Sequence, residues 1–283
     1  MKKILVTGGS GQLGSELRDL YQGREDVEAF FVDREELALD DIDGIIEGIY
    51  NYSPDIIIHC GAYTAVDKAE TNGEIADKVN HLASGEIAKY CAQYGAKLLA
   101  ISTDYVFDGN SSTPLDENAT VNPINVYGET KLKGEQAIQA NLPDAIIIRT
   151  AWVYSAYGHN FVKTMIRLMG EHDEISVIAD QIGSPTYALD LAKAIESIID
   201  GQNWMSGIYH FSNEGEVSWF DFAVAIKEFK NLDCIINAIP TSDYPTQAKR
   251  PKFSLLDKTK IRMNFGVEVP FWKNSLKKML TKV

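Results

Sequence analysis

The sequence has few cysteines, and they form no recognisable pattern. Cys60, Cys91 and Cys234 are odd in number and include no Cys-x-x-Cys pair, which argues against a disulfide framework or a zinc knuckle. The five histidines show no His-x-x-x-His or His-Glu-x-x-His spacing, so we expect no metal site. Because nothing here requires an oxidising compartment, we expect a cytoplasmic location.

Long apolar runs and excess positive charge are also lacking. The run from Ile4 to Val6 is too short for a signal peptide, and no later stretch approaches a membrane span. The chain has 27 Lys and Arg residues against 40 Asp and Glu residues. The resulting net charge of −13 argues against binding to nucleic acid or to an anionic membrane through bulk charge.

The first half of the chain alternates short β-branched runs with segments of helical apolar spacing. One such helical segment has Leu13, Leu17 and Leu20 on one face. This alternation predicts an α/β fold with a Rossmann-type, doubly wound parallel sheet. The expected buried strands are Ile4–Val6, Ala29–Val32, Ile56–His59, Leu98–Ser102, Ala145–Arg149 and Ile175–Ile178.

After about Tyr154 the alternation gives way to short aromatic stretches marked by glycine and proline. We therefore expect a smaller C-terminal α/β domain that binds the substrate and covers the carboxyl edge of the sheet. Residues 1–150 and 172–202 are assigned to the dinucleotide-binding domain. Residues 151–171 and 203–283 are assigned to the smaller domain.

Three glycines, Gly8, Gly11 and Gly14, follow the first expected strand, with Gln12 and Leu13 between the last two. Glycine allows a tight turn and lets backbone N–H groups approach a pyrophosphate at a helix N-terminus. A plain strand-to-helix turn is the alternative. The position of the triplet at the first such junction favours a dinucleotide cofactor.

Asp33 ends the second expected strand, about twenty residues beyond the glycine loop. An acidic side chain there accepts hydrogen bonds from the adenosine ribose, which favours NADH. The next residue is Arg34, whose guanidinium is suited to the 2′-phosphate of NADPH. Both cofactors remain open.

Tyr127 and Lys131 are four residues apart at the start of an expected helix and so lie on one face. A neighbouring ammonium and the nicotinamide ribose of a bound cofactor favour the phenolate and bring the tyrosine pKa toward working pH. Thr103 ends the fourth strand at the same crevice. An ordinary surface Tyr/Lys pair is the alternative, but together with the glycine loop these residues indicate carbonyl reduction.

This set resembles the extended, sugar-nucleotide branch of the short-chain dehydrogenase/reductases. Within that branch the chain is similar to the dTDP-4-dehydrorhamnose reductase family over nearly its whole length. The segments that carry the resemblance are Ala62–Glu70, Ser102–Gly109, Arg149–Tyr154, Gln181–Thr186, Gly207–Ser212 and Arg250–Pro251.

The resemblance implies reduction of the C4 ketone of dTDP-4-dehydro-6-deoxy-L-mannose to dTDP-L-rhamnose by NADPH or NADH. Tyr127 is then the proton donor, Lys131 its pKa tuner and ribose ligand, and Thr103 the hydroxyl that polarises the ketone. Asp104 and Trp152 match substrate contacts, and Arg250 is the preferred cation for the substrate diphosphate. The expected cofactor contacts are Gly8, Gly11, Gln12, Leu13, Gly14, Asp33, Arg34, Leu39, Ala62, Tyr63, Thr64, Ile101, Ser102, Tyr127 and Lys131.

Single residues distinguish this activity from the other activities of the branch. Related 4,6-dehydratases carry an Asp-Glu pair where this chain has Asp104 followed by Tyr105, so dehydration is disfavoured. Another sugar-nucleotide 4-ketoreductase or epimerase, or a regulatory subunit like that of methionine adenosyltransferase, is the alternative. Some relatives dimerise through magnesium, but we expect none here, and the chain to be a monomer or a homodimer.

Overall fold

Six parallel strands form the central sheet of the computed structural model, which describes residues 1–283. The strand order reverses between β1 and β3, and the ends of two such neighbouring strands form the crevice where α/β proteins bind ligands. In spatial order the strands are β10 (Gly207–His210), β5 (Ile146–Thr150), β4 (Lys97–Thr103), β3 (Ile56–His59), β1 (Lys2–Thr7) and β2 (Val27–Val32).

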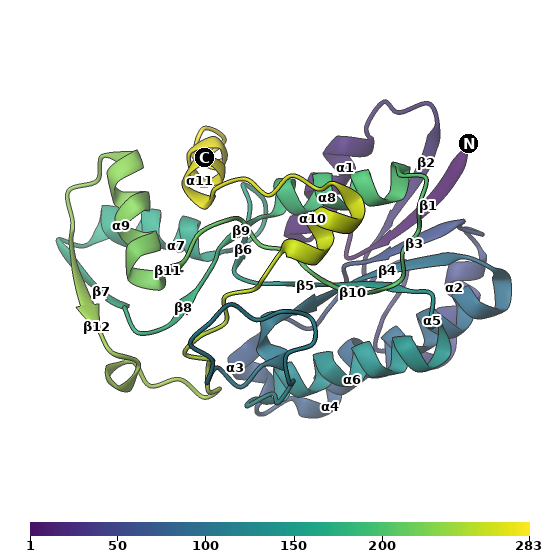
Figure 1. The fold of residues 1–283 in the computed structure, drawn as a ribbon, viewed down its shortest axis with the longest axis horizontal. Helices are drawn as coiled ribbons and strands as arrows, with labels where there is room; N and C mark the ends of the chain where they lie inside the picture. The colour runs from purple at the N-terminus through teal and green to yellow at the C-terminus, as the bar shows by residue number, and fades with distance from the viewer.

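Helices cover both faces of this sheet, as a doubly wound fold requires (Figure 1). Successive strand residues point to opposite faces, so Ile4 and Val6 pack into one core and Leu5 into the other. One face is covered by α1 (Gln12–Tyr21), α8 (Ala188–Asp200) and α10 (Thr259–Phe265). The other is covered by α2 (Ile45–Tyr50), α5 (Ala83–Tyr94) and α6 (Val126–Asn141).

Short helical segments connect these elements at the carboxyl edge of the sheet. After β3 come α3 (Val66–Ala69), α4 (Gly73–Asp77) and a π-helix (Lys78–Leu82) that leads into α5. Single 3-10 turns lie at Ile42–Gly44, Asp104–Val106 and Thr241–Asp243.

The smaller part of the molecule has its own core of 17 buried residues. Its helices are α7 (Phe161–Glu171), α9 (Trp219–Lys230) and α11 (Trp272–Leu280), on the left of Figure 1. Three two-stranded sheets join them: β6 (Val153–Tyr154) with β9 (Thr186–Tyr187), β7 (Glu174–Ile178) with β12 (Ile235–Ile239), and β8 (Ile182–Gly183) with β11 (Val217–Ser218).

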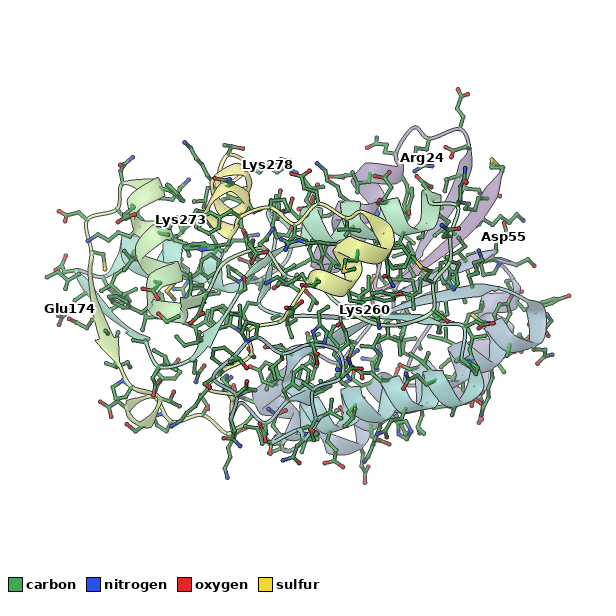
Figure 2. All side chains as sticks on the ribbon, viewed as in Figure 1. Arg24, Asp55, Glu174, Lys260, Lys273 and Lys278 are labelled. Carbon is green, nitrogen blue, oxygen red and sulfur yellow. The ribbon has the colours of Figure 1, made fainter.

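The first five expected strands lie in the central sheet. Ile175–Ile178 does form a strand, but the prediction that it is a buried strand of the sheet was wrong. That segment forms β7, which pairs only with β12, and Val177 alone is buried in it. Figure 2 shows Glu174 of β7 at the end of the molecule opposite Asp55, which precedes β3. Two chain segments far apart in sequence form this pair, so local periodicity could not assign it.

The sixth strand of the sheet is instead β10, from the segment expected in the smaller domain. Its outer edge is covered by α10, where Lys260 donates to the carbonyl oxygen of Ile208 at 2.7 Å, and Figure 2 shows Lys260 on that helix. A helix that covers an edge strand discourages further strand pairing. The division of the chain into two domains remains a prediction.

None of the helices combines the length and apolar character needed to cross a membrane. All three cysteines are free, and Cys91 and Cys234 are buried.

Candidate active site

The predicted glycine turn is confirmed as the connection from β1 to α1. Gly8 has a left-handed φ of +68°, and a side chain there would lie 2.9 Å from the backbone of Gly61. A Cβ on Gly14 would lie 2.3 Å from the carbonyl oxygen of Gly8. Only glycine lets the helix start this close to the strand. Gly11 is the N-cap of α1, which begins at Gln12 as expected.

A cleft of about 640 Å³ opens in front of this turn, at the carboxyl ends of the strands. It brings together loops that follow β1, β2, β3, β4 and β5, as the switch-point rule predicts. Fifteen of the nineteen predicted site residues line it: Gly8, Gly11, Gln12, Leu13, Gly14, Asp33, Ala62, Thr64, Ile101, Ser102, Thr103, Asp104, Tyr127, Lys131 and Trp152.

Four predicted site residues do not line the cleft. Arg34 is paired with Asp40 at 2.6 Å, with 77% of its side chain exposed. Leu39 packs over Gly61, where an added Cβ would lie 2.6 Å from its methyl group.

The other two, Tyr63 and Arg250, are bound to side chains outside the cleft. The backbone N–H of Tyr63 donates to Asn80 Oδ1 at 2.8 Å, and Asn72 Nδ2 donates to its hydroxyl at 3.4 Å. The guanidinium of Arg250 is bound to Asp67. In this arrangement Arg250 faces a carboxylate and not the cleft where we expected a diphosphate.

The cleft also contains residues that sequence reasoning missed. Tyr105 could have been predicted, because it directly follows the predicted site residue Asp104. Gly158 and His159 lie in a loop of the smaller part that has no recognisable motif. The full set of missed lining residues is Ser10, Cys60, Val66, Tyr105, Thr150, Val153, Gly158, His159 and Leu191.

Asp33 faces the cleft beside the glycine turn. Its Oδ1 accepts a hydrogen bond from the backbone N–H of Ser10 at 3.1 Å. The backbone N–H of Asp33 donates to Glu36 Oε2 at 3.0 Å. The carboxylate is therefore held where a hydroxyl-bearing ligand at the loop would meet it.

Tyr127 lies in the first turn of α6, which starts at the N-cap Asn125 because Asn125 Oδ1 accepts from the N–H of Gly128 at 2.8 Å. The phenol is buried, and burial raises its pKa to about 12, while a hydrogen bond with Thr103 opposes that rise. The free protein therefore lacks the shift toward neutral pH, and the shift expected with a bound cofactor stays a prediction. Sequence spacing brings Lys131 close but does not reveal how far the phenol is removed from water.

Lys131 is buried one turn further along α6. Its Nζ donates to the carbonyl oxygen of Ile101 at 2.8 Å. Burial lowers its pKa to about 8, and the Glu135 carboxylate opposes that fall. At neutral pH the ammonium is thus a donor at the wall of the cleft, within one helical turn of Tyr127.

Asp104 is the third buried polar group of this wall. Thr103 Oγ1 donates to Asp104 Oδ1 at 3.1 Å, while Oδ2 is buried without a hydrogen-bond partner. Burial raises the pKa of Asp104 to about 6. An unpaired buried oxygen is costly, so this atom is suited to accept a hydrogen bond from a ligand.

Trp152 closes the far end of the cleft with a strained backbone, since its φ is +48°. Its ring stacks on Trp219 at a centroid distance of 3.6 Å and an angle of 12°. Gly183 packs against the indole, because a Cβ there would lie 3.0 Å from the ring. The stack holds the indole at the edge where the smaller part meets the sheet.

Beneath Lys131 lies a buried charge pair that the sequence did not predict. Arg149 of β5 binds Glu135 of α6 through Nη2 at 2.7 Å and Nε at 2.9 Å, and both side chains are at most 3% exposed. Ser102 also donates to Glu135. The pair anchors α6 to β4 and β5 directly behind the cleft.

The parts of the cleft fit a dinucleotide. Gly8, Gly11 and Gly14 line the cleft at the N-terminus of α1 without side chains that would fill it. Asp33 is a hydrogen-bond acceptor beside this turn, and Lys131 is a donor on the opposite wall. These are the groups that hold a pyrophosphate and two riboses. No group of three or more His, Cys, Asp or Glu residues is arranged to hold a metal ion.

The whole chain is similar to one protein family. The family model described as RmlD substrate binding domain matches residues 1–283. A dTDP-4-dehydrorhamnose reductase of Aggregatibacter actinomycetemcomitans is 41% identical over 288 residues, which cover 98% of each chain.

Two crystal structures extend this similarity to the fold. A dTDP-4-dehydrorhamnose reductase from Bacillus anthracis in complex with NADP is 39% identical, with a TM-score of 0.95 and coverage of 100% of both chains. One from Clostridium acetobutylicum is also 39% identical, with a TM-score of 0.95 and coverage of 99% of this chain and 98% of that one.

Proposed function

Since the chain belongs to the dTDP-4-dehydrorhamnose reductase family, we propose that it is an NADPH- or NADH-dependent oxidoreductase with that family's reaction. The substrate is then dTDP-4-dehydro-6-deoxy-L-mannose, and its C4 ketone is reduced to give dTDP-L-rhamnose. The observation that supports this most is the meeting of Thr103, Tyr127 and Lys131 in one cleft with the glycine turn.

The chain's own residues have separate tasks in this reaction. The glycine turn and Asp33 bind the pyrophosphate and adenosine ribose, and Lys131 binds the second ribose. When bound, the reduced nicotinamide supplies the hydride. Thr103 and Tyr127 orient the ketone by donating hydrogen bonds to its oxygen. That oxygen becomes an alkoxide as C4 is reduced, and it takes the proton from Tyr127 Oη.

The high pKa of Tyr127 suits a donor that must keep its proton until the alkoxide forms. Because burial raises that pKa to about 12, the phenol is fully protonated at neutral pH. Lys131 stabilises the phenolate left behind, which regains a proton from solvent. Asp104 and Trp152 are proposed to contact the sugar nucleotide from the other side of the cleft.

The alternatives lack support at this site. Elimination of water needs a separate acid and base, and Asp104 is followed by Tyr105 with no second carboxylate. A partner-binding subunit has no need of the reducing residues, yet Thr103, Tyr127 and Lys131 are all present in the cleft. A cytoplasmic location and a monomer or homodimer remain predictions.

The proposed activity is tested by mixing the purified protein with dTDP-4-dehydro-6-deoxy-L-mannose and either reduced nicotinamide cofactor. We expect the absorbance of the reduced nicotinamide to fall, with one dTDP-L-rhamnose formed for each cofactor consumed. Tyr127→Phe is the control for a contaminating reductase. The substrate assignment fails if neither cofactor is oxidised while the protein binds both.

Cofactor preference depends on Asp33, because its carboxylate repels a 2′-phosphate and accepts from a 2′-hydroxyl. Asp33→Ser is expected to raise the kcat/KM for NADPH relative to NADH by about tenfold or more, since removing a like-charge contact of this kind is worth at least about 1.4 kcal/mol. Arg34→Gln is the matched control, because Arg34 is exposed and paired with Asp40. A marked loss of NADPH use in that control would show that Arg34 turns into the cleft.

Cofactor affinity is expected to depend on pH through Lys131. Its pKa is about 8 in the free protein, so the donor is charged below that pH and neutral above it. Raising the pH from about 7 to about 9 should weaken NADPH binding by about tenfold, because a charged hydrogen-bond donor is worth about 1.5–3 kcal/mol. Nicotinamide fluorescence measures the Kd. Lys131→Met should bind weakly at every pH, and an equal slope in that variant would assign the effect to another group.

A further inference from the structure

Asp67 and Arg250 form a two-point ion pair between segments that are 183 residues apart in the chain. Arg250 Nη2 lies 2.6 Å from Asp67 Oδ2, and Nη1 lies 3.2 Å from Oδ1. The same carboxylate accepts from the backbone N–H of Ala248 at 3.0 Å. Hydrogen bonding to Arg250 lowers the pKa of Asp67. The fork of the guanidinium matches the carboxylate in a way that lysine cannot reproduce.

The segment that carries Arg250 also holds the N-terminus of α6. Asn125, the N-cap of that helix, donates from Nδ2 to the carbonyl oxygen of Lys249 at 2.7 Å. Its Oδ1 is the cap that accepts from Gly128. A shift of residues 248–250 therefore moves the residue that sets where α6 begins, two positions before Tyr127.

The segment that carries Asp67 holds the same helix from the other side. In α3, Val66 and Ala69 pack with Tyr127 in one small apolar cluster. The next residue, Glu70, accepts from the N–H of Val126 through Oε1 at 2.9 Å. Two unrelated segments thus hold the first turn of α6, and the Asp67–Arg250 pair joins them.

Tyr105 links the pair to the reacting phenol itself. The charge of Arg250 opposes the rise that burial causes in the pKa of Tyr105, so the guanidinium lies near that phenol. The Tyr105 ring in turn meets the Tyr127 ring edge to face, at a centroid distance of 5.5 Å and an angle of 77°. The ring of Tyr127 therefore packs against a neighbour that lies close to Arg250.

We propose that Asp67 and Arg250 are positioning residues, whose ion pair clips α3 to residues 248–250 and so fixes Tyr127 in the cleft. This inference rests on the proposed function, in which Tyr127 donates the proton. It replaces the expectation that Arg250 binds the substrate diphosphate. A proton donor displaced by about 1 Å lowers turnover by about a hundredfold, while substrate binding elsewhere in the cleft is unaffected.

Steady-state kinetics separate the two roles of Arg250. If it is part of a clip, Asp67→Asn, Arg250→Gln and Arg250→Lys each lower kcat by about ten- to a hundredfold with little change in KM. The double variant Asp67→Asn/Arg250→Gln is then no worse than the single ones, because the two residues act as one unit. Arg262→Gln, which breaks the exposed pair with Glu214, is the matched control and should behave like the unaltered protein.

The opposite pattern would contradict the proposal that Asp67 and Arg250 position Tyr127. A diphosphate ligand predicts a raised KM in Arg250→Gln, a nearly normal KM in Arg250→Lys, and no loss of kcat in Asp67→Asn. Hydrogen exchange of the amides from Gly128 to Lys131 gives a second readout that needs no substrate. Exchange should quicken in Asp67→Asn and in Arg250→Lys but not in Arg262→Gln.

The two readouts also separate the clip from the proposed function. If the protein does not reduce the ketosugar at all, the proposed function fails, and hydrogen exchange still decides whether the ion pair holds α6. Unchanged exchange in both clip variants contradicts the clip whatever the activity. Should Arg250→Gln fail to fold, Asp67→Asn and Arg250→Lys carry the test, because both keep hydrogen-bonding side chains of similar size.

Discussion

Replacing Tyr127 with phenylalanine is expected to lower kcat by about 10²- to 10⁴-fold, the usual contribution of a general acid. The ring still fills its buried position, so the fold and the Tyr105 contact remain. Only the phenolic hydroxyl and its proton are lost. Oxidation of NADPH in the presence of the ketosugar measures the loss.

Two controls make this result specific to the proton. NADPH affinity, followed by nicotinamide fluorescence, should stay within about twofold, because in the proposed function the cofactor is held mainly by the glycine turn, Asp33 and Lys131. Tyr154→Phe makes the same chemical change at a buried phenol that has no hydrogen-bond partner and should leave the rate unaltered. A Tyr127→Phe enzyme with near-normal turnover would remove Tyr127 from the role of proton donor.

The largest loss of stability is expected from Glu135→Leu. Arg149 then keeps its charge in a site where its side chain is only 3% exposed, without the carboxylate that binds it. Removing one partner of a buried ion pair costs about 3–5 kcal/mol. The free energy of unfolding in urea should fall by that amount, and Ser102 loses its acceptor as well.

The double variant Glu135→Leu/Arg149→Met tests the cause. It removes both charges, and replacing a whole buried pair by apolar residues of similar size is often neutral, so most of the lost stability should return. Glu129→Leu, in the exposed pair with Lys133 on the same helix, should change stability by no more than about 0.5 kcal/mol. A Glu135→Leu protein that is as stable as this control would contradict the account of the buried pair.

Local patterns predicted the parts of the fold that depend on neighbouring residues. The first five strands, the glycine turn and the helix that carries Tyr127 and Lys131 follow from periodicity and from residue types at fixed spacing. The strand at 174–178 has the same composition as a core strand, but its pairing with β12 depends on residues about sixty positions away. Pairing over such distances is not encoded in a short window.

The same distinction applies to the site. Most of the predicted residues that follow a strand end line the cleft, because parallel strands deliver their loops to one edge, but Arg34 and Tyr63 do not. Arg250 does not line the cleft either, because it is paired with Asp67 of α3. The pKa of Tyr127 in the free protein shows the same limit of local patterns. The charge of Lys131 is visible in the sequence, whereas burial, the largest cause of the raised pKa, is a property of the packed structure.

The place of β10 at the end of the sheet has a consequence for synthesis on the ribosome. Five strands are complete once residue 150 has emerged, but β5 then has an unpaired edge. Residues 207–210 fill that edge in the folded protein, and the face containing Ile4 and Val6 packs against α8. A nascent chain of this length exposes an apolar sheet edge of the kind that chaperones bind. Folding of the cofactor-binding part is therefore completed by the C-terminal third of the chain.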